Sequence, residues 1–246
     1  MTLWHQLPEG PSLRGALPLV AARWLITYGG TGGSSSFGGA AATFDDVLNL
    51  TVASASVGSS IARARPYPGA WPRMEGDVMA RVDFTSGNGD ADGAILVGIG
   101  GPLSTDSWVA LRCGGDGNLR LVDSTGADHT TDVAGPSSGE RTGGNLFLRL
   151  TRTPVGVVGL WGVAAGADHF PLTWFPAGVV CDVDVLNASQ GGAPMIAVYS
   201  TGGGVSGGVT VQVSGVGVFG RSLVALGGSV ALDSSGRAPV WTAEDS

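Results

Sequence analysis

The chain has 246 residues, of which 43% are apolar and 13% are charged, and its formal net charge is −7. So much apolar material with so little charge argues against a disordered chain. An acidic chain without a basic block is a poor partner for nucleic acid or anionic membranes, and no apolar run reaches the roughly 18 residues of a membrane-spanning helix.

Residues 1–42 are expected to form an N-terminal arm. They include the run GGTGGSSSFGGAAA at residues 29–42, which buries little surface and is typical of a linker. Residues 13–25 are the best helix candidate, but Pro18 interrupts them, so an extended arm is equally expected. Three large aromatic side chains of the arm need a partner surface, either the chain's own sandwich or a neighbouring subunit. They are Trp4, Trp24 and Tyr28.

Strand patterns fill residues 43–219. Residues 77–84 alternate polar and apolar side chains, the period-two signature of a half-buried strand. Residues 108–112 and 119–123 flank a turn of glycine and asparagine, which predicts a hairpin. Further strands are expected at residues 47–52, 94–99, 146–152, 157–163, 170–175, 179–185, 193–200 and 209–219. Residues 63–72 are expected to form a proline-rich loop, and residues 220–246 a last strand and a polar tail.

Glycine is the most over-represented residue, with 43 copies. Its copies cluster between short apolar runs, which is typical of many short strands joined by tight turns. About a dozen such strands with no convincing long helix predict an all-β fold. We expect one antiparallel, jelly-roll-like β-sandwich over residues 43–219, preceded by the N-terminal extended arm.

The order of the strand segments carries a family resemblance. A strand with outward polar residues (DVMARVDF) precedes an acidic loop and a strand ending in glycine (AILVGIG). A tryptophan-bearing strand (WVALRC), a hairpin (GGDGNLRLVD), an arginine-alternating strand (LFLRLTR) and its partner (VVGLWGV) follow, and a late strand (VTVQVSGVGVF) closes the sheet. This order resembles the concanavalin A-like lectin and glucanase superfamily, the laminin-G-like jelly rolls.

Catalytic residues are not expected. Hydrolases of the superfamily it resembles use a Glu-x-Asp-x-x-Glu strand, and retaining hydrolysis needs two carboxylates about 5 Å apart. The four glutamates have no such spacing. Asp182 and Asp184 share one strand face, for which plain solvation is the favoured interpretation. The sequence has three histidines but no GxSxG nucleophile elbow. Cys113 and Cys181 are too far apart in sequence to form a metal-binding CxxC motif. We therefore expect a protein that is not an enzyme.

The sequence allows two kinds of ligand site, a calcium site and a sugar-binding site. The segment NGDADG matches the start of a calcium loop, and its oxygen ligands would be Asn88, Asp90 and Asp92. A glutamate is missing at the twelfth position, so this is no EF-hand, and a solvated strand connection is favoured over a looser calcium site. Exposed aromatic rings can stack on sugars; the candidates are Tyr67, Trp71 and Trp174. Trp108 and Trp161 lie in apolar strands and are expected in the core.

Composition favours a particle protein as the first functional hypothesis. All 13 basic residues are arginine, and a glycine-rich arm before a jelly roll resembles structural proteins of tailed bacteriophages with GC-rich hosts. The start of the chain shows no secretory signal. We therefore expect a tail, baseplate or head-surface protein of the virion, which assembles with other virion subunits as a homo-oligomer and contacts a host surface glycan. The alternative is a carbohydrate-binding module of a secreted or surface protein.

Overall fold

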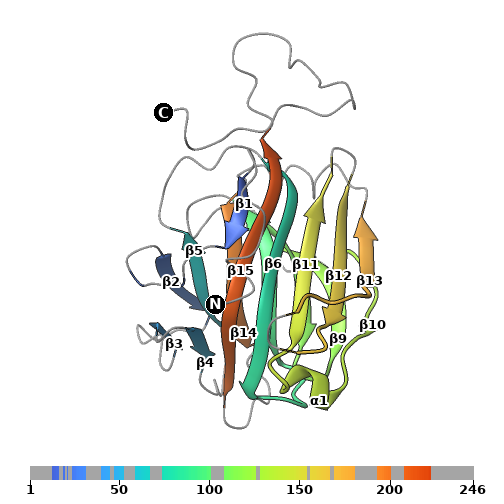
Figure 1. Ribbon diagram of the computed structural model, residues 1–246. Coiled ribbons are helices and arrows are strands. Elements are labelled where there is room, and N and C mark those ends of the chain that lie inside the picture. Colours follow the sequence, from blue (N-terminus) through green and yellow to red (C-terminus); the bar gives the residue numbers. More distant parts are fainter. Residues whose placement is uncertain are drawn as a thin grey trace, which may run out of the picture.

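Alternating side chains sort the strands into two antiparallel sheets that pack face to face (Figure 1). The computed structural model describes residues 13–16, 19, 21, 24–31, 40–44, 47–52, 59–66, 74–100, 108–125, 128–153, 156–166, 169–180, 193–200 and 208–222. The predicted antiparallel β-sandwich is confirmed.

The larger sheet has eight strands within the described residues. Seven follow one another in the order β13 (Phe175–Val180), β12 (Val157–Val163), β11 (Leu146–Arg152), β6 (Met74–Ser86), β15 (Val209–Ser222), β4 (Leu48–Val52) and β3 (Ala40–Phe44). The short strand β1 (Leu13–Ala16) also pairs with β15.

The smaller sheet has seven strands within the same described ranges. Their order is β10 (Val133–Ala134), β9 (Asn118–Asp123), β8 (Trp108–Gly114), β7 (Gly93–Gly100), β14 (Ala193–Ser200), β5 (Ser59–Pro66) and β2 (Trp24–Thr31). The hairpin expected between β8 and β9 is confirmed. Its turn needs Gly117, which has a φ of +91°.

The core lies between the sheets and follows from the period-two pattern of each strand. On β6, Val78, Val82 and Phe84 point inward, in one cluster with Ile95 and Val97 of β7. Burying a side chain of this size contributes roughly 1.5–3 kcal/mol, so this cluster holds the two sheets together. The intervening residues of β6 consequently lie on the outer face of the larger sheet.

Strands β6 and β15 form the long central pair of the larger sheet. Their register runs from Ser86 beside Thr210 to Met74 beside Ser222, with irregularities next to Val211 and Gly215. Such bulges bend a strand and increase its twist. In Figure 1 the two strands run side by side through the middle of the front sheet.

Two sequence predictions are wrong. Residues 63–66 lie in strand β5, not in a proline-rich loop, because Ala62 and Ala64 are buried in the core and alternate with Arg63 and Arg65 on the other face. A strand was expected at residues 170–175, but strand β13 begins only at Phe175. The apolar residues before it belong to a loop. Within the expected loop before β11, residues Ser138–Arg141 form the short helix α1.

The described parts of the expected arm pair with the sheets. Strand β1 joins β15, β2 joins β5 and β3 joins β4, so the sheets begin before residue 43. Trp24 is 4% exposed and belongs to the core cluster between the sheets, so its side chain is not available to a partner. Tyr28, on the same strand, is 39% exposed. Trp4 lies outside the described residues.

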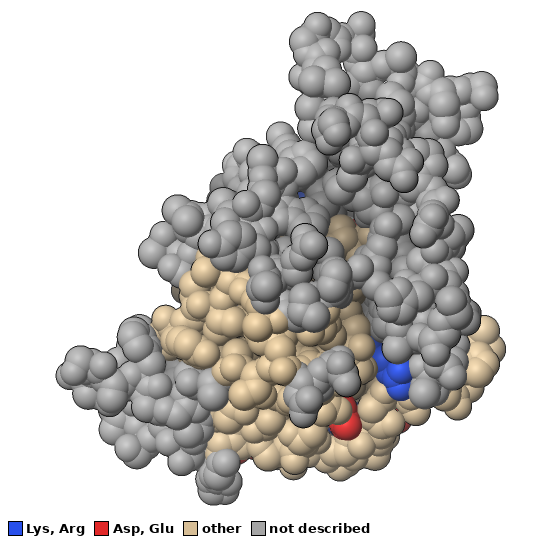
Figure 2. Space-filling view, turned by 60° about the vertical axis from the view of Figure 1, so that its left-hand side comes forward, with Lys and Arg blue, Asp and Glu red and all other residues tan. Residues whose placement is uncertain are grey.

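The described part of the chain contains no helix with the length and apolar character needed to cross a membrane. Figure 2 turns the β2–β5 side of the molecule forward. Among the described residues visible there, charged atoms are few and gather near the lower edge. This agrees with the low charge content of the sequence.

Candidate functional site

A row of hydrogen-bonding side chains crosses the outer face of the larger sheet. The register places Thr43 beside Asn49, Asn49 beside Gln212, and Gln212 beside Asp83. Asn145 precedes the Leu146–Val82 pair and so lies next to Asp83. We call these five residues the polar row. Four strands and the start of a fifth supply them, and each residue is at least partly exposed.

Neighbouring side chains of the row interact with one another. The Gln212 side-chain amide lies 3.4 Å from the Asn49 oxygen. Arg81 lies on the same outer face, two residues before Asp83 on β6. It donates through Nη2 to the Asn145 oxygen at 2.7 Å and through Nε to the Gly144 carbonyl at 2.6 Å. The row therefore presents hydroxyl, amide and carboxylate groups in a fixed order on the sheet, with the Arg81 guanidinium beside it.

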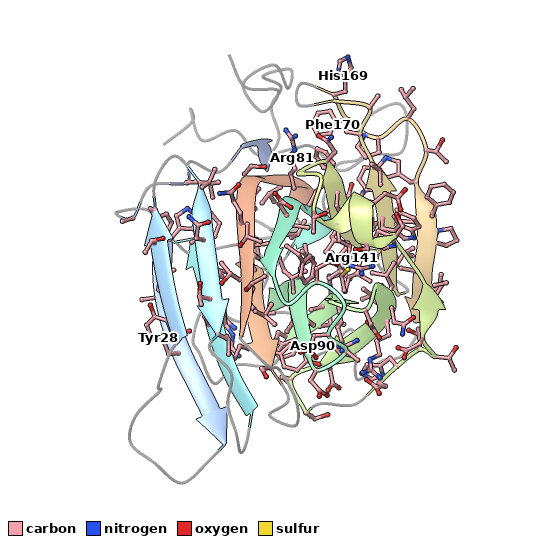
Figure 3. All side chains as sticks on the ribbon, turned by 90° about the horizontal axis from the view of Figure 1, so that it is seen from below. Tyr28, Arg81, Asp90, Arg141, His169 and Phe170 are labelled. Carbon is pink, nitrogen blue, oxygen red and sulfur yellow. The ribbon has the colours of Figure 1, made fainter. Side chains whose placement is uncertain are left out.

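An aromatic loop borders the row. It links β12 to β13 and is described at residues 164–166 and 169–174. Phe147 points outward from β11, yet it is fully buried, because the ring centroids of Phe170 and Trp174 lie 5.6 and 6.5 Å from its own. Figure 3 shows His169 and Phe170 on the same side of the sandwich as Arg81. The loop thus stands beside the polar row as a raised border.

The close approach of this loop depends on Gly162. A Cβ atom at this position would lie 2.7 Å from both the Pro171 Cβ and the Thr173 carbonyl oxygen. The loop is also held by the Ala164 N–H, which donates to the Asn145 carbonyl at 3.0 Å. Asn145 therefore belongs to the row through its side chain and anchors the loop through its backbone.

Charged groups beneath the loop are paired. The Arg149 guanidinium donates to the Asp77 carboxylate, which also accepts from the Thr151 hydroxyl at 2.5 Å. The same guanidinium lies 5.4 Å from the Trp174 ring centroid. These contacts fix one side of Trp174. Trp174, predicted from the sequence as a sugar contact, therefore lies on this face, partly exposed and rigidly held.

Asp83 is the electrostatically unusual member of the row. Burial raises the pKa of its carboxyl, an effect opposed by a hydrogen bond from the Gly144 backbone and by the charge of Arg81. Its Oδ1 atom is shielded and has no hydrogen-bond donor. A polar atom left without a partner costs free energy, and desolvated carboxylates are characteristic of functional sites.

No sequence pattern predicted the polar row or the burial of Phe147. The alternation of residues 77–84 does place Arg81 and Asp83 on one face, so the signal was present for β6. The other predicted sugar contacts, Tyr67 and Trp71, lie outside the described residues, as do Asp182 and Asp184.

The predicted calcium loop lies at one end of the sandwich, near Asp90 and Arg141 in Figure 3. The Asn88 oxygen accepts a hydrogen bond from Arg141 Nε at 2.8 Å. Asp90 uses Oδ1 to accept from the Asp92 N–H at 3.0 Å. Calcium needs six to eight oxygens, and a cation already holds one of these three. The residues present therefore do not fit calcium. Among the described residues, no three or more His, Cys, Asp or Glu side chains gather where they could hold a metal ion.

No protein-family model matches the chain, and no curated protein matches it. Solved structures share its fold. The Bacillus licheniformis β-glucanase is 10% identical, with 85% of this chain and 98% of that chain covered and a TM-score of 0.51. The calcium-bound VIP36 exoplasmic/lumenal domain is 8% identical (89% and 88% covered, TM-score 0.49), and a Bauhinia forficata lectin in complex with GalNAc is 10% identical (80% and 93% covered, TM-score 0.46). The similarity to the β-glucanase confirms the fold resemblance stated from the sequence.

Proposed function

We propose that the outer face of the larger sheet binds a neutral glycan through the polar row and the aromatic loop, without hydrolysing it. The observation that carries this proposal is the position of Asp83. The Asp83 carboxylate is partly desolvated, its Oδ1 atom has no donor, and it lies in a row of polar side chains two residues from Arg81, whose guanidinium is 5.9 Å from the Phe147 ring.

A sugar suits this arrangement because its hydroxyls both donate and accept. A hydroxyl can supply the donor that the Oδ1 atom of Asp83 lacks, since rotation about the terminal bond of the side chain presents either carboxylate oxygen to the open side. Asn49 and Gln212 offer both donors and acceptors for further hydroxyls. The half-exposed rings of Phe170 and Trp174 can pack against the apolar face of a pyranose. The fold shared with a β-glucanase also supports a carbohydrate ligand.

Neutral ligands fit better than anionic ones. Arg149 and Arg81, which lie on this face, already have acceptors, Arg149 on Asp77 and Arg81 on Gly144 and Asn145. An acidic sugar would bring a second negative charge towards Asp83, which is already costly to ionise there. The net charge of −7 adds to that repulsion.

We propose binding without hydrolysis because Asp83 lies far along β6 from the other carboxylates of that strand, Glu75 and Asp77. Asp77, the nearer of the two, is six residues from Asp83, which is about 20 Å. Glycoside hydrolysis by two carboxylates needs about 5 to 9.5 Å. Asp77 is also occupied by Arg149 and Thr151. Elsewhere His129 bonds Asp123 at 2.9 Å, and Arg120 lies between Asp128 and Asp132.

The test combines a glycan array with the variant Asp83→Asn. We expect at least about ten-fold weaker binding, because a charge-assisted hydrogen bond is lost, together with higher stability at neutral pH, because the desolvated charge is gone. A residue with a purely structural role would not lower affinity while raising stability. Asp128→Asn is the matched control: this carboxylate is 49% exposed and bonds Arg120, so both readouts should stay unchanged. A wild-type protein that binds no glycan, or an Asp83→Asn variant that binds as tightly as wild type, refutes the proposal.

Assembly into a particle remains the second candidate function. Tyr28 supports it, since this ring is 39% exposed on β2, the last strand of the smaller sheet within the described residues. Outer strands offer unpaired backbone groups to a partner. The virion role and the homo-oligomer stay predictions; genes for tail or capsid proteins beside this one would favour them, and a monomer encoded among unrelated genes would count against them.

A further inference from the structure

Three loops meet at one end of the sandwich. They are the β6–β7 turn at residues 87–92, the β8–β9 turn at residues 114–117 and the segment around α1. Their backbones touch directly: the Gly89 N–H donates to the Gly115 carbonyl at 2.5 Å, and the Gly135 N–H to the Gly117 carbonyl at 3.1 Å.

Arg141 lies at the centre of this meeting point and is 4% exposed. Its Nε donates to the Asn88 oxygen at 2.8 Å and its Nη1 to the Pro136 carbonyl at 2.5 Å. Asn88 in turn donates to the Ser138 hydroxyl at 2.7 Å. One buried guanidinium therefore ties the acidic turn to the α1 segment.

The third loop is shaped to admit the same guanidinium. A Cβ atom at Gly117 would lie 2.2 Å from Arg141 Nη1, so only glycine leaves room there. From the other side, Arg112 Nη2 donates to the Ala91 carbonyl at 2.6 Å while its Nε donates to the Tyr199 hydroxyl at 3.0 Å. Two arginines thus hold oxygen atoms of the segment whose sequence resembles a calcium loop.

We propose that the Arg141 guanidinium takes the place of a divalent cation at this end of the sandwich, so that the protein keeps its loops ordered without calcium. A buried cation with fixed donors orients the Asn88 oxygen and ties the turn to the α1 segment, which is the structural work of a calcium ion in such a loop. A calcium ion at Asn88 would meet the positive charge of Arg141 at close range. A second consequence, which rests on the proposed function, is that glycan binding persists without calcium.

The melting temperature of the full chain provides the test. In wild-type protein we expect the same value, within about 1 °C, in excess EDTA and in excess calcium chloride, because an ion that binds only the folded state would raise it. Arg141→Met should lower it by about 8 °C or more, since Asn88 and Pro136 lose their donor. Arg120→Met is the matched control, an arginine with surface ion pairs, and should change it by about 2 °C or less.

Asn88→Ala keeps the test decisive if Arg141→Met does not fold. This variant removes one acceptor of the guanidinium and should lower the melting temperature by about 2 to 5 °C, equally with and without EDTA. Stabilisation of wild type by calcium, or an Arg141→Met variant as stable as Arg120→Met, would overturn the proposal. The thermal readout uses no glycan, so its outcome stands even if the proposed function fails.

Discussion

Phe147 is the residue on which the position of the aromatic loop depends. It projects from β11 on the outer face of the larger sheet, where an aromatic ring would ordinarily be exposed, and the loop buries it completely. Phe147→Ala removes the surface against which Phe170 and Trp174 pack. We expect the loop to detach while the two sheets stay folded.

The size of the effect follows from the burial. Replacing a fully buried phenylalanine by alanine costs about 3 to 5 kcal/mol, and this figure includes the two ring contacts and the Arg81 guanidinium at 5.9 Å from the ring. For a chain of this size the loss corresponds to about 6 to 20 °C in melting temperature. Glycan affinity should fall at least about ten-fold, because the border of the site is lost.

Phe84→Ala is the matched control. Phe84 is 2% exposed and lies between the sheets, so the same substitution should cost a similar free energy of unfolding. Hydrogen exchange separates the two variants through the Ala164 amide, which bonds the Asn145 carbonyl. Its exchange should become much faster in Phe147→Ala, by local opening, but follow only the global stability in Phe84→Ala. Equal protection of Ala164 in both variants, with glycan binding intact, would refute the role given to Phe147.

Three further predictions concern single residues. Gly162→Ala should destabilise the protein by roughly 1 to 3 kcal/mol and speed hydrogen exchange of the Ala164 amide, since a Cβ atom would collide with Pro171. An unchanged midpoint of urea unfolding would contradict this prediction. The raised pKa of Asp83 means that its charged form is disfavoured in the folded state. The stability gained by Asp83→Asn should therefore be largest at neutral pH and shrink as pH falls through that pKa. A stability gain that grows towards low pH would contradict the raised pKa. Burial raises the pKa of the Cys113 thiol to about 12. In a Cys181→Ser background Cys113 should therefore resist thiol reagents at neutral pH until the protein unfolds. Rapid labelling of the folded protein would contradict the burial of this thiol.

Local patterns predicted the strands whose alternation is complete in the sequence itself. Residues 77–84 show it fully, and the structure extends them into β6. Strand β5 was missed because its inward residues, Ala62 and Ala64, are too small to produce a strong apolar signal. Residues 170–174 look like a strand because most of them are apolar. In the structure Phe170 and Trp174 pack on the outside of the sheet while Leu172 is exposed, an arrangement that only the tertiary structure decides.

The candidate site depends on distant parts of the chain. Asn49 and Gln212 are 163 residues apart in sequence yet lie side by side, and no local pattern connects them. The acidic turn had the residue types of calcium ligands, but Arg141, which binds its first member, lies 53 residues away. A sequence motif of this kind shows which oxygen ligands are present, but it does not show whether a metal ion or an arginine from elsewhere in the chain binds them.

The central place of β15 has a consequence for biosynthesis. This strand comes last among the described elements, yet it lies between β6 and β4 and pairs with both. Until β15 has left the ribosome, the larger sheet is divided into two parts with open edges, so the sheet cannot close before this strand is synthesised. Non-local pairing of this kind folds slowly and leaves exposed edges open to misassembly. We therefore expect the nascent chain to require protection from aggregation until β15 has emerged.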